Sequence, residues 1–353
     1  MKIVTIVGAR PQFVKAAAVS RALKEYANFE EVIVHTGQHF DINMSDIFFD
    51  ELLIPKPNYN LNINSLSHGA MTGRMLESIE EVLIKEKPTF VMVYGDTNST
   101  IAGALAAKKL HIKVIHVEAG LRSFNDKMPE EINRILTDRI SDILFCPTQQ
   151  AVSNLLKEGF RQNNADILKN GDVMQDAANF YSKFSKEPSF DFPEEFILLT
   201  MHRAENTDDL NRMNNIVSSL NSIHEKTPIL WLAHPRTKSI ISKEKIKVNF
   251  QMQNPVGYLE MIYLLRKCKL VITDSGGLQK EAFFFSKNCV TLREETEWVE
   301  LVDGGYNILA GSEPNKIQSA VSSMLIKKNN FNVDYYGNGQ AAKNIALHLQ
   351  SKI

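Results

Sequence analysis

The 353-residue sequence has few cysteines, no long hydrophobic run and almost no net charge. Cys146, Cys268 and Cys289 are odd in number and widely spaced among apolar residues, which predicts reduced, buried thiols. This spacing excludes a disulfide framework and gives no metal site. No apolar run reaches the roughly 18 residues that a membrane span requires. The 40 basic and 41 acidic residues balance, so no overall field attracts nucleic acid or an anionic membrane.

We therefore expect a cytoplasmic protein with no membrane or nucleic-acid partner, in which local groups hold any anionic ligand. Met1 leads directly into an apolar strand pattern, so we also expect no leader segment. With 44% hydrophobic and 23% charged residues, the composition is typical of a globular protein and excludes disorder as its main feature.

Short apolar, β-branched runs alternate with segments of helical periodicity along most of the chain. Continuous apolar strands that alternate with helices predict an α/β fold of parallel sheets covered on both faces. The predicted strands are residues 2–8, 29–36, 89–95, 113–118, 142–148, 165–171, 195–202, 228–234, 269–274 and 288–292.

Residues 182–195, SKFSKEPSFDFPEE, interrupt this alternation and show no apolar periodicity. Because 353 residues exceed what one hydrophobic core usually organises, we interpret this segment as a linker between two doubly wound domains, 1–181 and 196–335. Residues 336–353 are expected to form a terminal helix that packs back on the first domain. A cleft between the two domains is the expected ligand site.

Charged residues gather at predicted strand ends in the first half. After the first strand, VGARPQFVK has Gly8 for unusual backbone angles, and Arg10 and Lys15 near a helix N-terminus, which favours an anion. An ordinary strand–turn–helix loop explains this motif equally well.

Four candidate carboxylates, Asp96, Glu118, Glu130 and Glu131, follow the next strand ends, in YGDTNST (94–100) and HVEAGLRSFNDKMPEEINR (116–134). Asp96 is either a helix cap or a functional group. Glu130 and Glu131 are typical of a helix first turn and could pair with Arg134. Glu118 has no such local explanation, because nothing nearby needs a carboxylate at that strand end.

The second half carries groups suited to a phosphate ester. His202 and Arg203 leave a strand together, although a lone strand-end histidine is often structural. Ser275, Gly276 and Gly277 open a helix and can direct backbone amides at a phosphate. Two further candidates are Glu281, for the vicinal hydroxyls of a ribose, and Tyr258, for a nucleobase or for ordinary core packing.

Taken together, these motifs resemble the non-hydrolysing UDP-N-acetylglucosamine 2-epimerase family. The motifs GARPQFVK, TGQHF, GDTNST, HVEAGLR, MPEEINR, HRAEN, TDSGG and YGNGQA occur in family order over nearly the whole chain. The resemblance implies two Rossmann-like domains in a GT-B-like pair, a homodimer, a UDP-sugar substrate in the cleft and no external cofactor. It also implies C2 epimerisation, by anti-elimination of UDP to a 2-acetamidoglucal and re-addition, for surface polysaccharide precursors.

The resemblance assigns roles to the candidate residues. Asp96, Glu118 and Glu130 become acid/base groups, and His202 becomes the partner of the leaving group. The implied substrate ligands are Arg10, Lys15, Glu131, Arg203, Tyr258, Ser275, Gly276, Gly277 and Glu281. Gln38 and His39 match a Gln-His pair of the family's allosteric site.

Some residues depart from the common family pattern. Gln12 stands where many members have Glu, and Trp298-Val299 stand where Arg-Pro is usual. These variants resemble the branch that acts on UDP-2,3-diacetamido-2,3-dideoxy-glucuronic acid, with UDP-GlcNAc as the other candidate substrate. A GT-B glycosyltransferase, a hydrolysing 2-epimerase and a non-catalytic sugar-nucleotide binding protein are the alternatives.

Overall fold

The ten predicted strands are all present as parallel β-strands in the structure, which is a computed structural model that describes residues 1–38, 49, 52–160 and 165–352. The predicted α/β class with two doubly wound sheets is therefore confirmed. The chain divides into two compact units, Met1–Ala177 with Asp334–Ile353, and Ala178–Val333.

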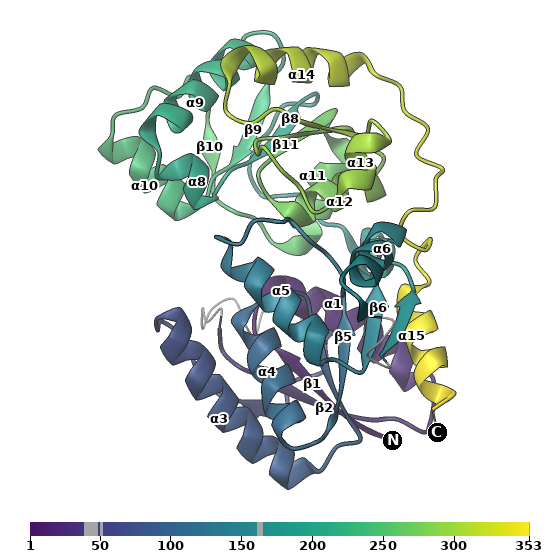
Figure 1. The fold of residues 1–353 in the computed structure, drawn as a ribbon. Helices are drawn as coiled ribbons and strands as arrows, with labels where there is room; N and C mark the ends of the chain where they lie inside the picture. The colour runs from purple at the N-terminus through teal and green to yellow at the C-terminus, as the bar shows by residue number, and fades with distance from the viewer. Residues whose placement is uncertain (39–48, 50–51, 161–164, 353) are drawn as a thin grey trace. The chain divides into compact units, whose positions relative to one another are not determined.

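Within its described residues, the first unit contains a seven-stranded parallel sheet in the order β3-β2-β1-β4-β5-β6-β7 (Figure 1). The central strands of this sheet are largely buried, because helices cover both faces. The strands are β1 (Lys2–Val7), β2 (Glu30–His35), β3 (Tyr59–Asn60), β4 (Phe90–Tyr94), β5 (Lys113–Val117), β6 (Ile143–Cys146) and β7 (Asp166–Lys169).

The helices of the first unit form two layers. Helices α3, α4 and α5 pack on one another in series, while α15, from the end of the chain, packs on α1 (Figure 1). Their bounds are α1 (Arg10–Lys24), α3 (His68–Glu86), α4 (Asn98–Lys109), α5 (Pro129–Ile140), α6 (Gln149–Lys157), α7 (Val173–Tyr181) and α15 (Ala341–Gln350).

The second unit has a six-stranded parallel sheet among its described residues, in the order β10-β9-β8-β11-β12-β13. The strands are β8 (Ile197–Thr200), β9 (Ile229–Leu232), β10 (Met252–Gln253), β11 (Leu270–Thr273), β12 (Cys289–Thr291) and β13 (Asn307–Leu309). The helices are α8 (Ala204–Thr207), α9 (Leu210–His224), α10 (Pro235–Lys243), α11 (Tyr258–Lys267), α12 (Gly276–Phe284), α13 (Val299–Asp303) and α14 (Pro314–Ile326).

Both sheets reverse their strand order at one point, between β1 and β4 in the first unit and between β8 and β11 in the second. Open parallel sheets bind ligands beyond the carboxyl ends of the strands at such switch points. The motifs VGARPQ and GDTN follow β1 and β4, and HRAEN and DSGG follow β8 and β11. All four therefore lie where a doubly wound sheet offers a site.

Three strands, β3, β10 and β13, were not predicted. They have only two or three residues, and all three are edge strands of their sheets. Segments this short carry no apolar periodicity, and their pairing depends on the neighbouring strand.

The unit boundaries differ from the predicted linker. The chain passes to the second unit at Ala177–Ala178 and returns at Val333–Asp334. Residues 182–195 belong to the second unit, where Phe190 and Phe192 pack against its core. Rings without regular spacing can still bury apolar area, which a periodicity argument does not detect.

Asp176 of α7 joins the end of the chain to the first unit. Its carboxylate accepts hydrogen bonds from the backbone amides of Ala341 and Ala342, at the start of α15. An acidic partner suits the unpaired amides and positive dipole end of a helix.

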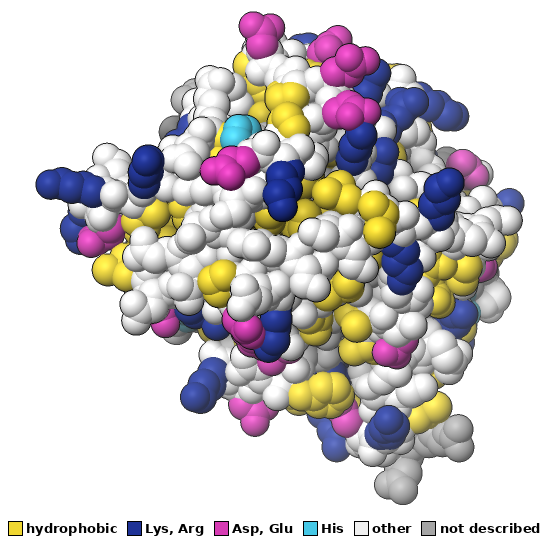
Figure 2. All heavy atoms as spheres, turned by 90° about the horizontal axis from the view of Figure 1, so that it is seen from above, with side chains coloured by type: hydrophobic (Ala, Val, Ile, Leu, Met, Phe, Trp, Pro, Cys, Tyr) yellow, Lys and Arg dark blue, Asp and Glu magenta, His cyan; other side chains and the backbone are white. Residues whose placement is uncertain are grey.

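The surface carries charges of both signs. On the face drawn in Figure 2, Lys and Arg side chains are interspersed with Asp, Glu and hydrophobic side chains. Among the described residues, no helix combines the length and apolar character that a membrane-spanning segment needs.

Candidate active site

The loop after β1 is built around the side chain of Gln12. Its Oε1 accepts from the backbone amides of Gly8 and Ala9, at 2.8 and 3.0 Å, and its Nε2 donates to the carbonyl of Tyr94 at 2.7 Å. Gln12 is buried and thereby ties the β1 loop to the end of β4. Gln12 therefore holds these two loops together, and it also lines the neighbouring pocket.

Gly8 is needed for space. A Cβ at Gly8 would lie 2.1 Å from the hydroxyls of both Thr36 and Ser99, and no positive φ is found there. The expectation that Gly8 provides unusual backbone angles is therefore wrong; the position requires close approach of the backbone to two side chains.

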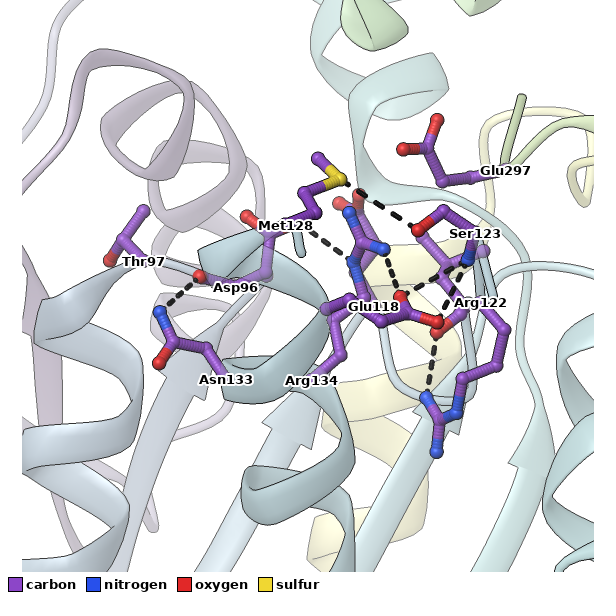
Figure 3. Close-up of polar contacts among 12 residues, drawn as sticks. Asp96, Thr97, Glu118, Arg122, Ser123, Met128, Asn133, Arg134 and Glu297 are labelled. Atoms are coloured by element: carbon purple, nitrogen blue, oxygen red, sulfur yellow. Dashed lines mark hydrogen bonds and ion pairs between the residues drawn. The ribbon is translucent and has the colours of Figure 1, made fainter. Parts of the chain in front are cut away.

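Asp96 follows β4 and is held by α5. Arg134 Nε donates to Asp96 Oδ2 and Asn133 Nδ2 donates to the Asp96 carbonyl, both at 2.9 Å (Figure 3). The helix α4 is capped instead by Thr97, whose side chain accepts from the Thr100 amide. The capping alternative for Asp96 is therefore wrong, and its carboxylate is oriented by a guanidinium.

Glu118 follows β5 with a left-handed backbone, φ 72°. Its amide and that of Ala119 both donate to the carbonyl of Phe145, which turns the chain sharply at the strand end. The Glu118 carboxylate forms an ion pair with the buried ammonium of Lys15. Lys15 thus pairs with a carboxylate of the protein, whereas the sequence predicted that it binds an anionic ligand.

Glu131 is fully engaged within the protein. Its carboxylate accepts from the backbone amides of Ser123 and Phe124 and from Arg134. The side chain is 1% exposed, so Glu131 holds the loop before α5 and orients the arginine that binds Asp96.

Glu130, its neighbour, lies in a small pocket of about 180 Å³ in the first unit. Asp96, Lys15 and Gln38 line the same pocket, and within the described residues the Glu130 side chain has no hydrogen bond or ion pair. Pockets for whole drug-sized ligands measure ~300–1,000 Å³, so this one has room for only part of a nucleotide sugar. Arg10, the first residue of α1, is half-buried beside it. His39 lies outside the described residues.

His202 of the second unit rests on a buried carboxylate. Its Nδ1 lies 3.2 Å from Asp274 Oδ1, and its imidazole is 49% exposed. Asp274, fully buried, also accepts from the backbone amides of His202 and Arg203. Burial raises the pKa of Asp274, but the His202 hydrogen bond and charge, with these amides, outweigh burial and hold the pKa below its ordinary value.

The turn at Ser275 presents helix amides. Ser275 is the N-cap of α12, and Gly276 and Gly277 are its first two residues, whose amides have no partner within the helix. A Cβ at Gly276 would lie 3.7 Å from the Trp298 indole nitrogen. Trp298, one of the residues that differ from the usual family pattern, therefore borders this turn. The Lys280 ammonium lies 4.0 Å from the centre of the Trp298 ring.

The remaining candidates of the second unit are more enclosed. Glu281 is 8% and Tyr258 6% exposed. The Tyr258 ring packs edge-on against Tyr181, as the core-packing alternative expects. Sequence reasoning missed Asp274, whose only signal is its place after a β-strand beside the Ser-Gly-Gly turn.

A family model described as UDP-N-acetylglucosamine 2-epimerase matches residues 21–350 of the chain. A UDP-2,3-diacetamido-2,3-dideoxy-D-glucuronate 2-epimerase of Pseudomonas aeruginosa is 56% identical over 351 residues, which cover 99% of each protein. The chain belongs to the UDP-N-acetylglucosamine 2-epimerase family. The family predicted from the motifs is confirmed. The prediction that the protein is an isomerase is confirmed as well, because members of the family are epimerases.

Solved structures of UDP-N-acetylglucosamine 2-epimerases share the fold. The enzyme of Methanocaldococcus jannaschii, in complex with UDP-GlcNAc and UDP, is 45% identical with a TM-score of 0.92, over 99% of this chain and 100% of that one. The enzyme of Neisseria meningitidis, bound to UDP-GlcNAc, is 30% identical with a TM-score of 0.88, over 99% and 100%. The two Rossmann-like sheets thus belong to the GT-B-like fold of this family.

Proposed function

We propose that this epimerase inverts C2 of a UDP-linked 2-acetamido sugar by elimination and re-addition of UDP. The observation that carries the proposal is the carboxylate pocket of the first unit: Asp96 and Glu130 line it, and Glu118 is paired with its Lys15. Carboxylates placed closely around one sugar carbon suit removal and return of a poorly acidic proton.

In the elimination, a carboxylate takes the C2 proton, the C–H electrons form the C1–C2 double bond, and the C1–O bond breaks. UDP leaves with the electron pair of the C1–O bond. Re-addition runs the same steps backward, with the proton delivered to the opposite face of C2. Glu130, which has no partner within the described residues, is our candidate for a proton-transferring group, whereas Asp96 and Glu118 are each fixed by a cation.

Departure of UDP builds negative charge on the β-phosphate, which fixed donors stabilise. We propose that the Gly276 and Gly277 amides and the exposed His202 ring stabilise this charge. Asp274 steadies the imidazolium form, in which the outer ring nitrogen carries a proton for the leaving oxygen. Arg10, Arg203, Glu281 and Tyr258 remain proposed ligands of the nucleotide.

For the substrate we favour UDP-2,3-diacetamido-2,3-dideoxy-glucuronate. The support is the 56% identity to a protein named for that sugar, against 53% to a protein named as a UDP-N-acetylglucosamine 2-epimerase homolog and 45% to the enzyme solved with UDP-GlcNAc. The test is incubation of each nucleotide sugar in deuterated water, followed by NMR of deuterium at C2 and of the manno epimer.

We expect faster exchange with the diacetamido sugar. Faster exchange with UDP-GlcNAc would reverse the substrate choice, and exchange with neither would overturn the function. Free UDP that accumulates in step with free epimerised sugar would identify a hydrolysing 2-epimerase instead. Sugar transfer to an acceptor without epimerisation would identify a glycosyltransferase.

We also propose a homodimer that works in the cytoplasm on surface polysaccharide precursors. The outer face of α5 exposes Ile132, Ile135 and Leu136, and an apolar helix face favours association. The free, buried cysteines suit a reducing compartment. Sedimentation equilibrium should give twice the monomer mass, and Ile135→Glu should reduce it towards the monomer.

A further inference from the structure

A buried charge network lies directly below the carboxylate loops of the first unit. The side chain of Asp138, near the carboxyl end of α5, is 0% exposed. The side chain of His116 in β5 is also 0% exposed. Asp138 Oδ1 lies 2.7 Å from His116 Nδ1, and Asp138 Oδ2 accepts from Arg122 at 2.7 Å. Arg122 also binds Glu158 through two nitrogens, at 2.7 and 2.8 Å.

The network reaches the loop that carries Asp96. His116 Nε2 lies 2.7 Å from the carbonyl oxygen of Gly95, the residue before Asp96. The Gly95 amide donates to the Val117 carbonyl at 3.0 Å, so both backbone groups of Gly95 are bound to β5 or its side chain. The main chain at Asp96 therefore has little freedom to move relative to β5.

The network also reaches the loop that carries Glu118. Asp138 Oδ2 accepts from the Gly120 amide at 3.0 Å, two residues beyond Glu118. Gly120 has φ 79°, and a Cβ there would lie 2.4 Å from the Ala151 carbonyl. This tight turn is thus held by the same carboxylate that holds His116.

The contacts of His116 define its charge. Its two ring nitrogens face a carboxylate and a carbonyl, which only accept hydrogen bonds. The ring must therefore donate from both nitrogens, as an imidazolium. Two cations, His116 and Arg122, then balance two carboxylates, Asp138 and Glu158, which is the condition under which buried charges are tolerated.

Asp138 is well suited to remain ionised in this position. Burial raises its pKa, but the hydrogen bond and charge of His116, together with Arg122, outweigh burial and keep the pKa below the ordinary aspartate value. An aspartate that stays charged keeps all its donors bound.

We propose that Asp138 and His116 are positioning residues that set the spacing of Asp96, Glu118 and Glu130. Asp138 belongs to the helix that carries Glu130, and through Gly120 and His116 it holds the other two loops. This inference rests on the proposed function, because it assigns all three carboxylates to one reaction. None of the network side chains needs to touch the sugar.

The test compares Asp138→Asn and His116→Asn with the wild-type protein. Turnover is measured as C2 deuterium exchange, UDP affinity by calorimetry and stability by urea unfolding. We expect turnover to fall about 10- to 100-fold, since a shift of about 1 Å costs ~100-fold in rate, with UDP affinity within about twofold. The double variant should fall no further than the worse single one, because both break the same connection.

Asp142→Asn is the matched control. Asp142 accepts from the Val114 amide at 2.8 Å and pairs with Lys108, so it holds the amino end of the same β5 strand. We expect it to lose stability with unchanged turnover per folded molecule. Asp138→Asn turnover within twofold of wild type, or a loss equal to that of Asp142→Asn, would overturn the proposal.

A second readout does not depend on the variants folding. In the wild-type protein, ¹⁵N NMR of His116 should show a ring protonated at both nitrogens, and a neutral ring would contradict the inference. The two proposals fail separately: wild type without C2 exchange overturns the function, whereas exchange that survives in Asp138→Asn overturns only the positioning role.

Discussion

Asp274 places a fully buried carboxylate 3.2 Å from the Nδ1 of His202, whose ring is half exposed. The same carboxylate accepts from the backbone amides of His202 and Arg203. One residue thus orients both the main chain and the ring at the end of β8. A carboxylate behind a histidine fixes its tautomer and stabilises its cation, so the outer nitrogen is the one available to a ligand.

Asp274→Asn should therefore slow the reaction more than it weakens binding. The amide no longer stabilises the His202 cation, and we expect kcat to fall about 10- to 100-fold with KM within about threefold. The pH profile of kcat should change, because the imidazole loses the neighbouring negative charge of Asp274. Steady-state kinetics between pH 5.5 and 9 measure both.

Asp209→Asn is the control for this change. Asp209 also accepts from backbone amides, as the N-cap of α9, but it has no histidine partner in the described structure. It should cost about 1 kcal/mol or less in unfolding free energy and leave the pH profile unchanged. An Asp274→Asn profile identical to wild type would refute the dyad.

Two adjacent glutamates should respond differently to the same substitution. Glu130→Gln should lower turnover at least about 100-fold with unchanged stability, because its carboxylate lines the pocket and has no partner in the described residues. Glu131→Gln should lower the unfolding free energy by about 1–3 kcal/mol, because it weakens a buried group that binds Arg134 and two backbone amides. Urea unfolding and C2 exchange on both variants are the measurement. Equal loss of stability in the two would contradict the assignment.

Because His35 is buried, we expect the protein to lose stability in mild acid. His35 is buried between the rings of Phe13 and Phe49, and burial lowers its pKa from 6.5 to about 4. The unfolded chain therefore takes up the proton first as pH falls. The unfolding free energy that neutral, buried His35 contributes is fully present above pH 6.5 and is lost as the pH falls from 6.5 to 4. The total loss is about 3 kcal/mol.

His35→Leu should flatten the pH dependence of unfolding free energy in that window. His111→Asn is the control, because His111 is exposed and has a positive φ of 59° that asparagine accepts. It should leave the slope unchanged. A slope that persists in His35→Leu would show that other groups cause it.

Gln12 should prove essential for stability. Gln12→Met keeps the length of the side chain but leaves the Gly8 and Ala9 amides and the Tyr94 carbonyl without this partner. We expect a loss of about 2–4 kcal/mol by urea unfolding. Gln150→Met, at a half-buried position where the side-chain amide bonds Asn154 alone among the described residues, should cost about 0.5 kcal/mol or less. Equal effects at both positions would contradict the role of Gln12.

Strand positions were predictable because a strand buried on both faces is mostly apolar. Residues 269–274 show this pattern and form β11, and residues 113–118, which form β5, show it apart from Lys113, His116 and Glu118. The short strands β3 and β10 were not predictable, since their pairing arises only when a neighbouring strand offers its edge. The division between the two units at Ala177–Ala178 lies inside helix α7, so the local sequence pattern gives no signal for it.

The sequence alone determined the family, the fold class and which motifs gather at strand ends, since these follow from local pattern and motif order. Only the tertiary structure decided what each charge does. Glu130 and Glu131 are neighbours with the same chemistry, yet one lines the pocket and the other is buried under backbone amides. Lys15 contacts Glu118, and Asp138 holds two loops from below. Such pairings depend on distances between residues far apart in the chain, and burial then sets the strength of each contact.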